Sequence, residues 1–219
     1  MTEPQHPVLS ELEFDALTEL VNLGVSRAAL SLREMIGREV LLSVPRVSLM
    51  ERREAIDSLG KAELSTLVAV HQIFEGDING RALLIFPEAK SLELVRAVAN
   101  GTLSLEDIVE LEHEALAETG NIILNGCLGT MANMLHRSLS VSLPEVVRGD
   151  GARLFEFDKQ SDGEDNGLVL FLYINFAMQD RDIRGYIAML MDLPSLGSLR
   201  LLIGDFIDRV MNEDIPLAV

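Results

Sequence analysis

The residues of this chain with the clearest chemical character are a carboxylate and an amide that occur twice with the same spacing. They are Asp15, Glu19 and Asn22 in the first half, and Glu114, Glu118 and Asn121 in the second. A carboxylate supplies negative charge, and an amide supplies both a hydrogen-bond donor and an acceptor. Because the pattern recurs, these are the candidate site residues, and the elements that carry them must hold them in equivalent positions.

The spacing places each set of residues on one face of a helix. Positions i, i+4 and i+7 fall within roughly 60° of one another on a helix. Behind the first set lie residues that can pack against the protein: Leu17, Leu20, Val21, Gly24 and Ala28. Behind the second set lie Leu116, Gly120, Ile123 and Cys127. Asparagine is a middling helix former, so its outward position in the middle of both helices indicates a role other than folding.

The repeat extends beyond these helices. A proline follows the asparagine by 23 residues in each copy, at Pro45 and at Pro144. Residues 77–95 also resemble residues 182–203. A single Glu-x-x-Asn would be interpreted as a solvated helix face, but its repetition at this spacing favours a functional site. The chain is therefore a tandem duplication of about 100 residues.

Hydrophobic periodicity predicts similar elements in both halves. The expected helices span residues 11–36, 88–99, 105–136 and 194–211. The expected strands span residues 39–47, 64–75, 78–86, 139–147, 152–158, 167–177 and 184–192. Ser10 and Glu13 predict a capping box at the first helix, and Gly37 suits its C-terminal cap. Hairpin links predict an antiparallel sheet, so the expected fold is α+β and α/β sandwich-like, with the two long helices carrying the motifs.

The duplication also predicts the domain organisation. We expect residues 1–10 to form an N-terminal tail. Residues 11–219 should form one pseudo-twofold domain, since the repeats at about 11–100 and 104–212 each offer only a few strands and two helices. A chain of 219 residues is long enough to bury a sizeable core.

Composition excludes several classes of function. The net charge of -17, from 18 basic and 35 acidic residues, opposes binding to nucleic acid or to anionic membranes, because both need a positive protein surface. No apolar run is long enough for a membrane span, and the N-terminus lacks the features of a signal peptide. A cytoplasmic protein is therefore expected. The single cysteine, Cys127, allows no intrachain disulfide and suits the core.

The remaining motifs offer no competing site. The four histidines lack metal-ligand spacing, so we expect no metal or cofactor of the protein's own. Residues 158–167 superficially suggest a calcium loop, but Gln160 and Val169 stand where ligands are required, and a hairpin turn is expected there instead. The sequence contains no phosphate loop, nucleophile elbow or dinucleotide fingerprint.

The motif pair resembles the signature of the CheC, CheX and FliY phosphatases of bacterial chemotaxis. That signature is an Asp or Ser, three residues, a Glu, two residues, an Asn, and then a proline at a spacing like the one found here. The stretches DALTELVN (residues 15–22) and EALAETGN (residues 114–121) look like it, and residues 22–47 look like a CheC first half. The resemblance covers roughly residues 11 to 212.

The resemblance implies a hydrolase that acts on the aspartyl phosphate of a phosphorylated CheY-type response regulator and so ends a two-component signal. Carried over to this chain, Glu19 and Glu118 would be docking carboxylates that contact a receiver lysine, and Asn22 and Asn121 would orient the attacking water. Asp15 and Glu114 would be secondary motif positions. The receiver would supply its own Mg²⁺, so the visiting protein needs mainly to align a water molecule.

The two copies differ in detail. Glu114 stands where the family usually has Asp or Ser. Val21 stands where a glycine often precedes the asparagine, whereas Gly120 keeps that glycine in the second copy. We expect both sites to be active.

Two other roles remain open at this point. The flagellar switch protein FliM has a related middle domain, and residues 9–20 resemble the short segment by which it binds CheY, which would suit a non-catalytic CheY-binding module. CheC proteins also bind the receptor deamidase CheD, so a scaffold role can coexist with phosphatase activity. The duplicated chain already contains the symmetry that a single-copy relative would obtain by dimerising, which favours a monomer.

Overall fold

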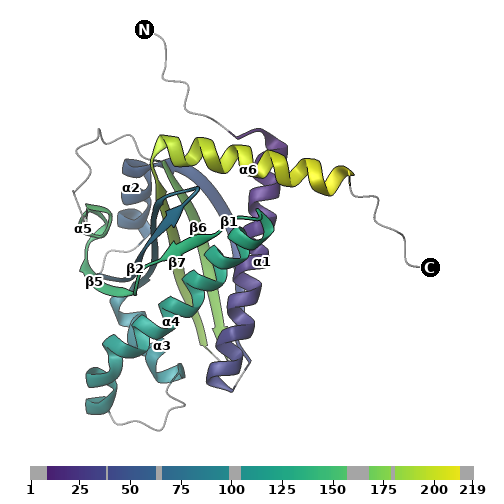
Figure 1. Cartoon of the computed structure of the whole chain (residues 1–219). Coiled ribbons are helices and arrows are strands. Elements are labelled where there is room, and N and C mark those ends of the chain that lie inside the picture. Colours follow the sequence, from purple (N-terminus) through teal and green to yellow (C-terminus); the bar gives the residue numbers. More distant parts are fainter. Residues whose placement is uncertain are drawn as a thin grey trace.

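Two long helices lie across one face of a seven-stranded antiparallel sheet, and two short helices cover the opposite face (Figure 1). The computed structural model describes residues 9–37, 39–62, 66–98, 105–156, 168–178 and 181–212. The helices are α1 (Glu11–Ile36), α2 (Arg52–Ala62), α3 (Glu88–Val98), α4 (Leu105–Met134), α5 (Gly151–Glu156) and α6 (Leu193–Asn212). The strands are β1 (Leu41–Glu51), β2 (Leu67–Gly76), β3 (Gly80–Pro87), β4 (Leu139–Val141), β5 (Glu145–Gly149), β6 (Leu168–Met178) and β7 (Arg181–Met191).

The strand order shows how the two halves of the chain share one sheet. The order is β1-β6-β7-β3-β2-β4, with β5 also pairing with β2. The hairpin β2–β3 of the first half lies beside the hairpin β6–β7 of the second, and β3 pairs with β7 at the centre. The strand that follows each long helix pairs with the other half's hairpin, since β1 joins β6 while β4 and β5 join β2. When each strand is replaced by its equivalent in the other half, the order read from one edge is the order read from the other edge. This arrangement confirms the predicted tandem pseudo-twofold α+β fold.

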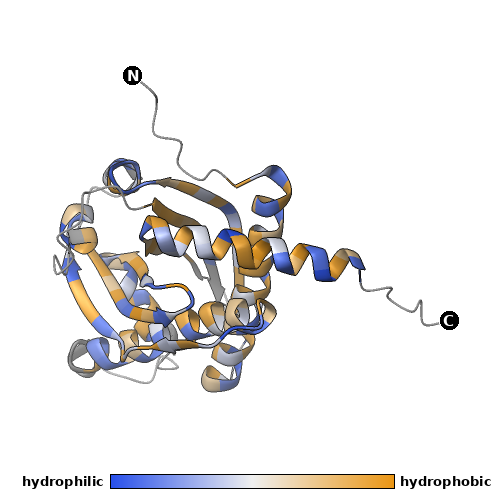
Figure 2. Cartoon of the chain, turned by 45° about the horizontal axis from the view of Figure 1, so that its top comes forward, coloured by the Kyte–Doolittle hydropathy of each residue, from blue (hydrophilic) through white to orange (hydrophobic). Residues whose placement is uncertain are grey.

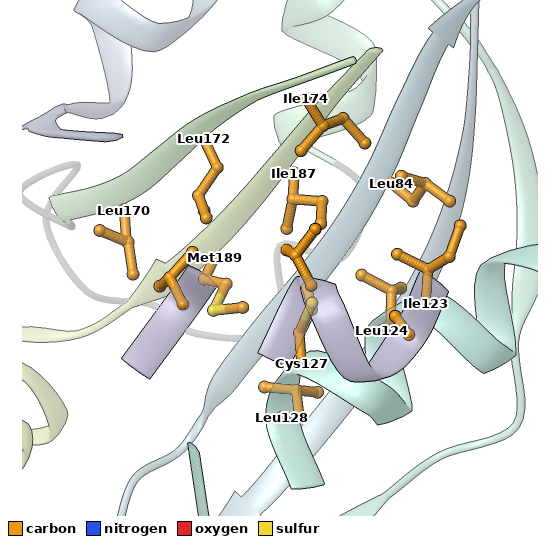
Figure 3. Packing of buried hydrophobic residues seen from close by; sticks show 14 of the residues in the cluster. Leu84, Ile123, Leu124, Cys127, Leu128, Leu170, Leu172, Ile174, Ile187 and Met189 are labelled. Carbon is orange, nitrogen blue, oxygen red and sulfur yellow. The ribbon is translucent and has the colours of Figure 1, made fainter. Parts of the chain in front are cut away.

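Apolar residues on the two faces of the sheet form two cores. The larger core joins the four helices α1, α3, α4 and α6 to one face, and the smaller one joins α2 and α5 to the other. Figure 3 shows Ile123, Leu124 and Cys127 of α4 near Leu84 and Ile187 of the sheet. The helices are amphipathic, as the mixture of hydrophobic and hydrophilic residues along α6 shows in Figure 2. Burial of the sheet from both sides explains the long apolar runs in β2, β3 and β7.

The ends of α1 match the predictions from sequence. The Ser10 hydroxyl accepts a hydrogen bond from the backbone N–H of Glu13, and the Glu13 carboxylate accepts one from the N–H of Ser10. Gly37 ends the helix in the left-handed conformation with φ 71°, which glycine adopts without strain. The bond from the Ser10 backbone is the main cause that lowers the pKa of Glu13, and Arg200 of α6 contributes. The start of α1 is therefore fixed both locally and to α6.

The structure differs from the sequence predictions at three places. The strand predicted at residues 152–158 is instead the helix α5 over Gly151–Glu156, which packs Leu154 and Phe155 against the smaller core. Helix α2 was not predicted from the sequence, because its mean hydropathy is low. Among its residues whose side chains the structure describes, Ala55 and Leu59 are the fully buried ones. The strand predicted at residues 139–147 is divided into β4 and β5. The hairpin turn predicted at residues 158–167 lies outside the described residues.

Long helices α1 and α4 touch through their backbones. A Cβ atom on Gly24 would lie 2.9 Å from the Cα of Cys127, and one on Gly126 would lie 2.9 Å from the Cβ of Ala28. Contacts this short require glycine at the crossing point. Burial raises the pKa of the Cys127 thiol to about 12, so this side chain stays neutral and acts as a small core residue. None of the helices in the described ranges combines the length and the hydropathy that a bilayer span needs.

We predict that Gly24→Ala destabilises the protein by about 1–3 kcal/mol, because the added methyl group would force α1 and α4 apart. The matched control is Gly129→Ala on α4, where a Cβ atom would meet nothing within 4 Å. This control should be neutral or stabilising by up to about 1 kcal/mol, because alanine is the better helix former. Urea denaturation followed by circular dichroism measures both. Equal stability of the two variants would contradict the close crossing.

Candidate functional site

The first motif lies on the side of α1 away from the core, as its spacing predicts. Asp15 and Glu19 are exposed, and Asn22 is half-buried. The residues predicted behind them are buried, with Leu17 and Leu20 at 0% exposure. A carboxylate therefore stands in solvent one turn before an amide that is partly sheltered by the fold.

The second motif has the same arrangement on α4, but its amide is held in place. Glu114 and Glu118 are exposed and Asn121 is half-buried. The Oδ1 atom of Asn121 accepts a hydrogen bond of 3.1 Å from Nε2 of Gln72 and one of 2.8 Å from Nδ2 of Asn125. These two bonds fill both lone pairs of the carbonyl oxygen.

Gln72 is a site residue that the sequence pattern did not single out. It lies on β2 with 0% exposure, and its Nε2 also donates to the backbone carbonyl of Ser142 at 2.9 Å. Its Oε1 has no hydrogen-bond partner among the described residues. A buried acceptor without a partner costs about 1–3 kcal/mol of stability. The signal in the sequence was a lone amide within the apolar run of β2.

The two prolines of the repeat interrupt strand pairing at equivalent places. Pro45 lies where the register between β1 and β6 shifts, between Ser43 and Arg46. Pro144 lies between β4 and β5, where pairing with β2 stops and resumes. Proline has no N–H for a ladder bond and is tolerated in edge strands and bulges. In the second copy this interruption brings the carbonyl of Ser142 to Gln72, next to Asn121.

Gly120 explains how Asn121 comes so close to β2. A Cβ atom at position 120 would lie 2.5 Å from the side chain of Val70 on β2, so the helix backbone packs directly against that side chain. In the first copy Val21 occupies the corresponding position and is 1% exposed. The difference noted between the two motifs in sequence is thus a difference in how closely helix and sheet can approach.

The amide of the first motif has a different surrounding. Within the described residues, the Asn22 side chain makes no hydrogen bond. The strand that follows α1 is β1, and it pairs with β6, just as β4 and β5 after α4 pair with β2. Strand β6 is therefore the equivalent of β2 at the first site. On the face of β6 that enters the larger core, the described side chains are all aliphatic: Leu168, Leu170, Leu172 and Ile174. The first site therefore has no counterpart of Gln72 on that face.

An exposed leucine lies beside the second site. Leu143 is 86% exposed and follows Ser142, whose hydroxyl donates to the Leu143 carbonyl at 3.1 Å. Leu23, which follows Asn22, is 38% exposed. An exposed apolar side chain next to a carboxylate and an amide can contribute a contact to a protein partner. Both candidate sites lie on open helix surfaces, while the groove between α1 and α6 is lined by other residues, including Glu13, Arg200 and Leu201.

Comparisons with known proteins give sequence relatives and structural neighbours. No protein-family model matches the chain. The chain is 28% identical over 141 residues to the CheY-P phosphatase CheC of Bacillus subtilis, which covers 63% of this chain and 67% of that protein. The crystal structure of Thermotoga maritima FliY has a TM-score of 0.70 at 17% identity and covers 91% of this chain and 99% of that one.

The FliM middle domain from H. pylori also shares the fold. Its TM-score is 0.56 at 10% identity, and the match covers 89% of this chain and 99% of that chain. At these identities the structural neighbours show a common fold alone, whereas the CheC match extends to the sequence. The chain is similar to CheC in sequence and to FliY in fold, in agreement with the resemblance that its two motifs carry.

Proposed function

We propose that this protein is a phosphatase that removes the phosphoryl group from the aspartyl phosphate of a CheY-type response regulator. The observation that carries the proposal is the pair of motifs on α1 and α4, in which an exposed glutamate precedes a half-buried asparagine. The sequence relative named CheY-P phosphatase CheC supports it. Hydrolysis of this phosphate would end the signal of a chemotaxis-like two-component system.

The reaction needs little from the protein that binds the receiver. The oxygen of a water molecule attacks phosphorus, the bond between phosphorus and the aspartyl oxygen breaks, and the receiver's carboxylate leaves with the bonding electrons. Both protons of the water remain on the released dihydrogen phosphate. Because the acyl phosphate is already activated and the receiver would carry Mg²⁺, the contribution of Asn22 and Asn121 is to place the water in line.

The glutamates are proposed to dock the receiver rather than to transfer protons. Glu19 and Glu118 are exposed and lie one helical turn from the asparagines. An exposed carboxylate can pair with a lysine of the receiver and fix the orientation of the complex, and Leu143 adds an apolar contact at the second site. Asp15 and Glu114, one further turn back, would extend the acidic stripe.

The principal alternative is a binding module without catalysis, as the shared fold with the FliM middle domain suggests. A module that only binds a receiver would need the exposed carboxylates and apolar residues. It would not need an asparagine whose carbonyl is held by two donors, as that of Asn121 is. This arrangement favours the phosphatase.

We predict that loss of both asparagines abolishes the acceleration of phosphate release. Asn22→Ala and Asn121→Ala each leave one site intact, so each single variant should still accelerate phosphate release. The accelerations of the two single variants should sum to that of the native protein. The double variant should fall roughly 10- to 100-fold, to the receiver's own rate, because the aligned water is lost. The measurement is phosphate release from a phosphorylated CheY-type receiver under single-turnover conditions.

Asn133→Ala is the matched control, since Asn133 is an exposed asparagine of α4 outside the motif. It should retain the native rate, and circular dichroism should show that all variants fold. A native chain that does not accelerate phosphate release, or a double variant that still does, would refute the phosphatase proposal.

We further predict that charge reversal of the docking glutamates weakens receiver binding. The double variant Glu19→Lys/Glu118→Lys should raise the Kd by roughly three- to tenfold, the range expected for exposed ion pairs. Added salt should weaken native binding in the same way, because it screens exposed charges. Glu34→Lys, at an exposed position near the end of α1, is the control for one such charge reversal, because it changes the net charge by the same two units as Glu19→Lys or Glu118→Lys alone.

Titration calorimetry measures these affinities with a receiver that carries beryllofluoride in place of the phosphoryl group, because the protein would hydrolyse the aspartyl phosphate during the titration. A result in which Glu34→Lys weakens binding as much as the double variant would mean that the overall charge matters and not the docking positions. Native binding that is indifferent to salt would also count against the role of Glu19 and Glu118.

A further inference from the structure

We propose that Gln72 is a positioning residue that fixes the amide of Asn121, so that the second site is preorganised and the first is not. This inference builds on the proposed phosphatase function and names a residue that the motif does not contain. Gln72 lies in the first half of the chain but serves the site of the second half, because β2 pairs with β4 and β5.

The hydrogen bonds determine which end of the Asn121 amide is free. Its Oδ1 accepts from Gln72 at 3.1 Å and from Asn125 at 2.8 Å. Its Nδ2 makes no hydrogen bond to a described residue. The amide therefore offers its two N–H groups as donors. If the Asn121 amide were flipped, its Nδ2 would face the Nε2 donor of Gln72, and two donors cannot form a hydrogen bond with each other.

A fixed donor suits the proposed chemistry. An N–H of Asn121 can donate to one lone pair of the water oxygen and leave the other lone pair to attack phosphorus. Because the amide is held before the receiver binds, little ordering is needed in the transition state. Asn22 has no such restraint within the described residues, so its amide must be oriented after binding.

Apart from the bond that Nε2 donates to the backbone carbonyl of Ser142, an exposed residue, the fold gives no reason for an amide at this position. Gln72 is fully buried among apolar residues, and its Oε1 lacks a partner among the described residues, which costs stability. The corresponding face of β6 carries aliphatic side chains throughout its described part. An aliphatic residue of similar size could fill the same space, and the glutamine differs from it by the hydrogen bonds that it donates to Asn121 and to the Ser142 carbonyl.

The test uses Gln72→Leu in the full chain that also carries Asn22→Ala, so that only the second site can act. We expect kcat to fall about tenfold with little change in KM, because orientation is lost while docking residues remain. The thermal midpoint should change little, because removal of the unpaired buried acceptor offsets the loss of the two bonds that Nε2 donates. Asn125→Ala, which removes the second donor from an exposed position, should lower kcat by a smaller factor.

A second measurement does not depend on activity. Side-chain ¹⁵N relaxation by NMR should give Asn121 an order parameter near that of rigid backbone, about 0.85, and Asn22 one below about 0.6. Asn133, an exposed asparagine on α4, is the internal reference for an unrestrained amide. Gln72→Leu should lower the order parameter of Asn121 toward that of Asn133.

Each outcome decides the matter. A Gln72→Leu variant that keeps its kcat, or that raises KM alone, overturns the positioning role, and so does an Asn121 amide as mobile as Asn133. A fall in kcat that accompanies a lower thermal midpoint and a general loss of order means that Gln72 is structural only. If Asn121 is ordered but the native chain does not accelerate phosphate release, the proposed function fails, and the catalytic meaning of the restraint fails with it.

Discussion

Direct backbone contact between α1 and α4 is the constraint on which the rest of the structure depends. The contact requires Gly24 and Gly126, and it lies over the larger core where Cys127 is buried. With the two helices joined there and resting on one face of the sheet, each turns its acidic and amide residues away from the core. Any change in the crossing would move both motifs at once, because they lie on the same two rigid helices.

The exchange of edge strands makes each site a product of both halves. The strand after each long helix pairs with the hairpin of the other half, so neither half completes its own sheet. At the second site the helix and the proline segment come from the second half, while Gln72 comes from the first. The sequence repeat marks the helices correctly but cannot show which strand will lie beneath each one, since that depends on pairing between distant segments.

The parts of the fold that were predicted from sequence depend on local chemistry. Residue type and spacing predict the capping box of Ser10 and Glu13 and the left-handed conformation of Gly37. They also predict the solvent-exposed faces of the two long helices. Helix α5 was mistaken for a strand because its six residues are too few to show a period, and packing of Phe155 decides its form. Gln72 was missed because its role arises only when β2 meets α4, and an isolated glutamine in an apolar run carries no motif.

The duplication within a single chain has a consequence for how the two sites can change over time. In an assembly of two identical subunits, every substitution occurs at both sites, so a residue that costs stability is present twice. Here the two halves are encoded separately, and one can keep a glutamine beneath its helix while the other keeps aliphatic residues. Covalent linkage of the two halves thus allows substitutions to accumulate at one site without changing the other.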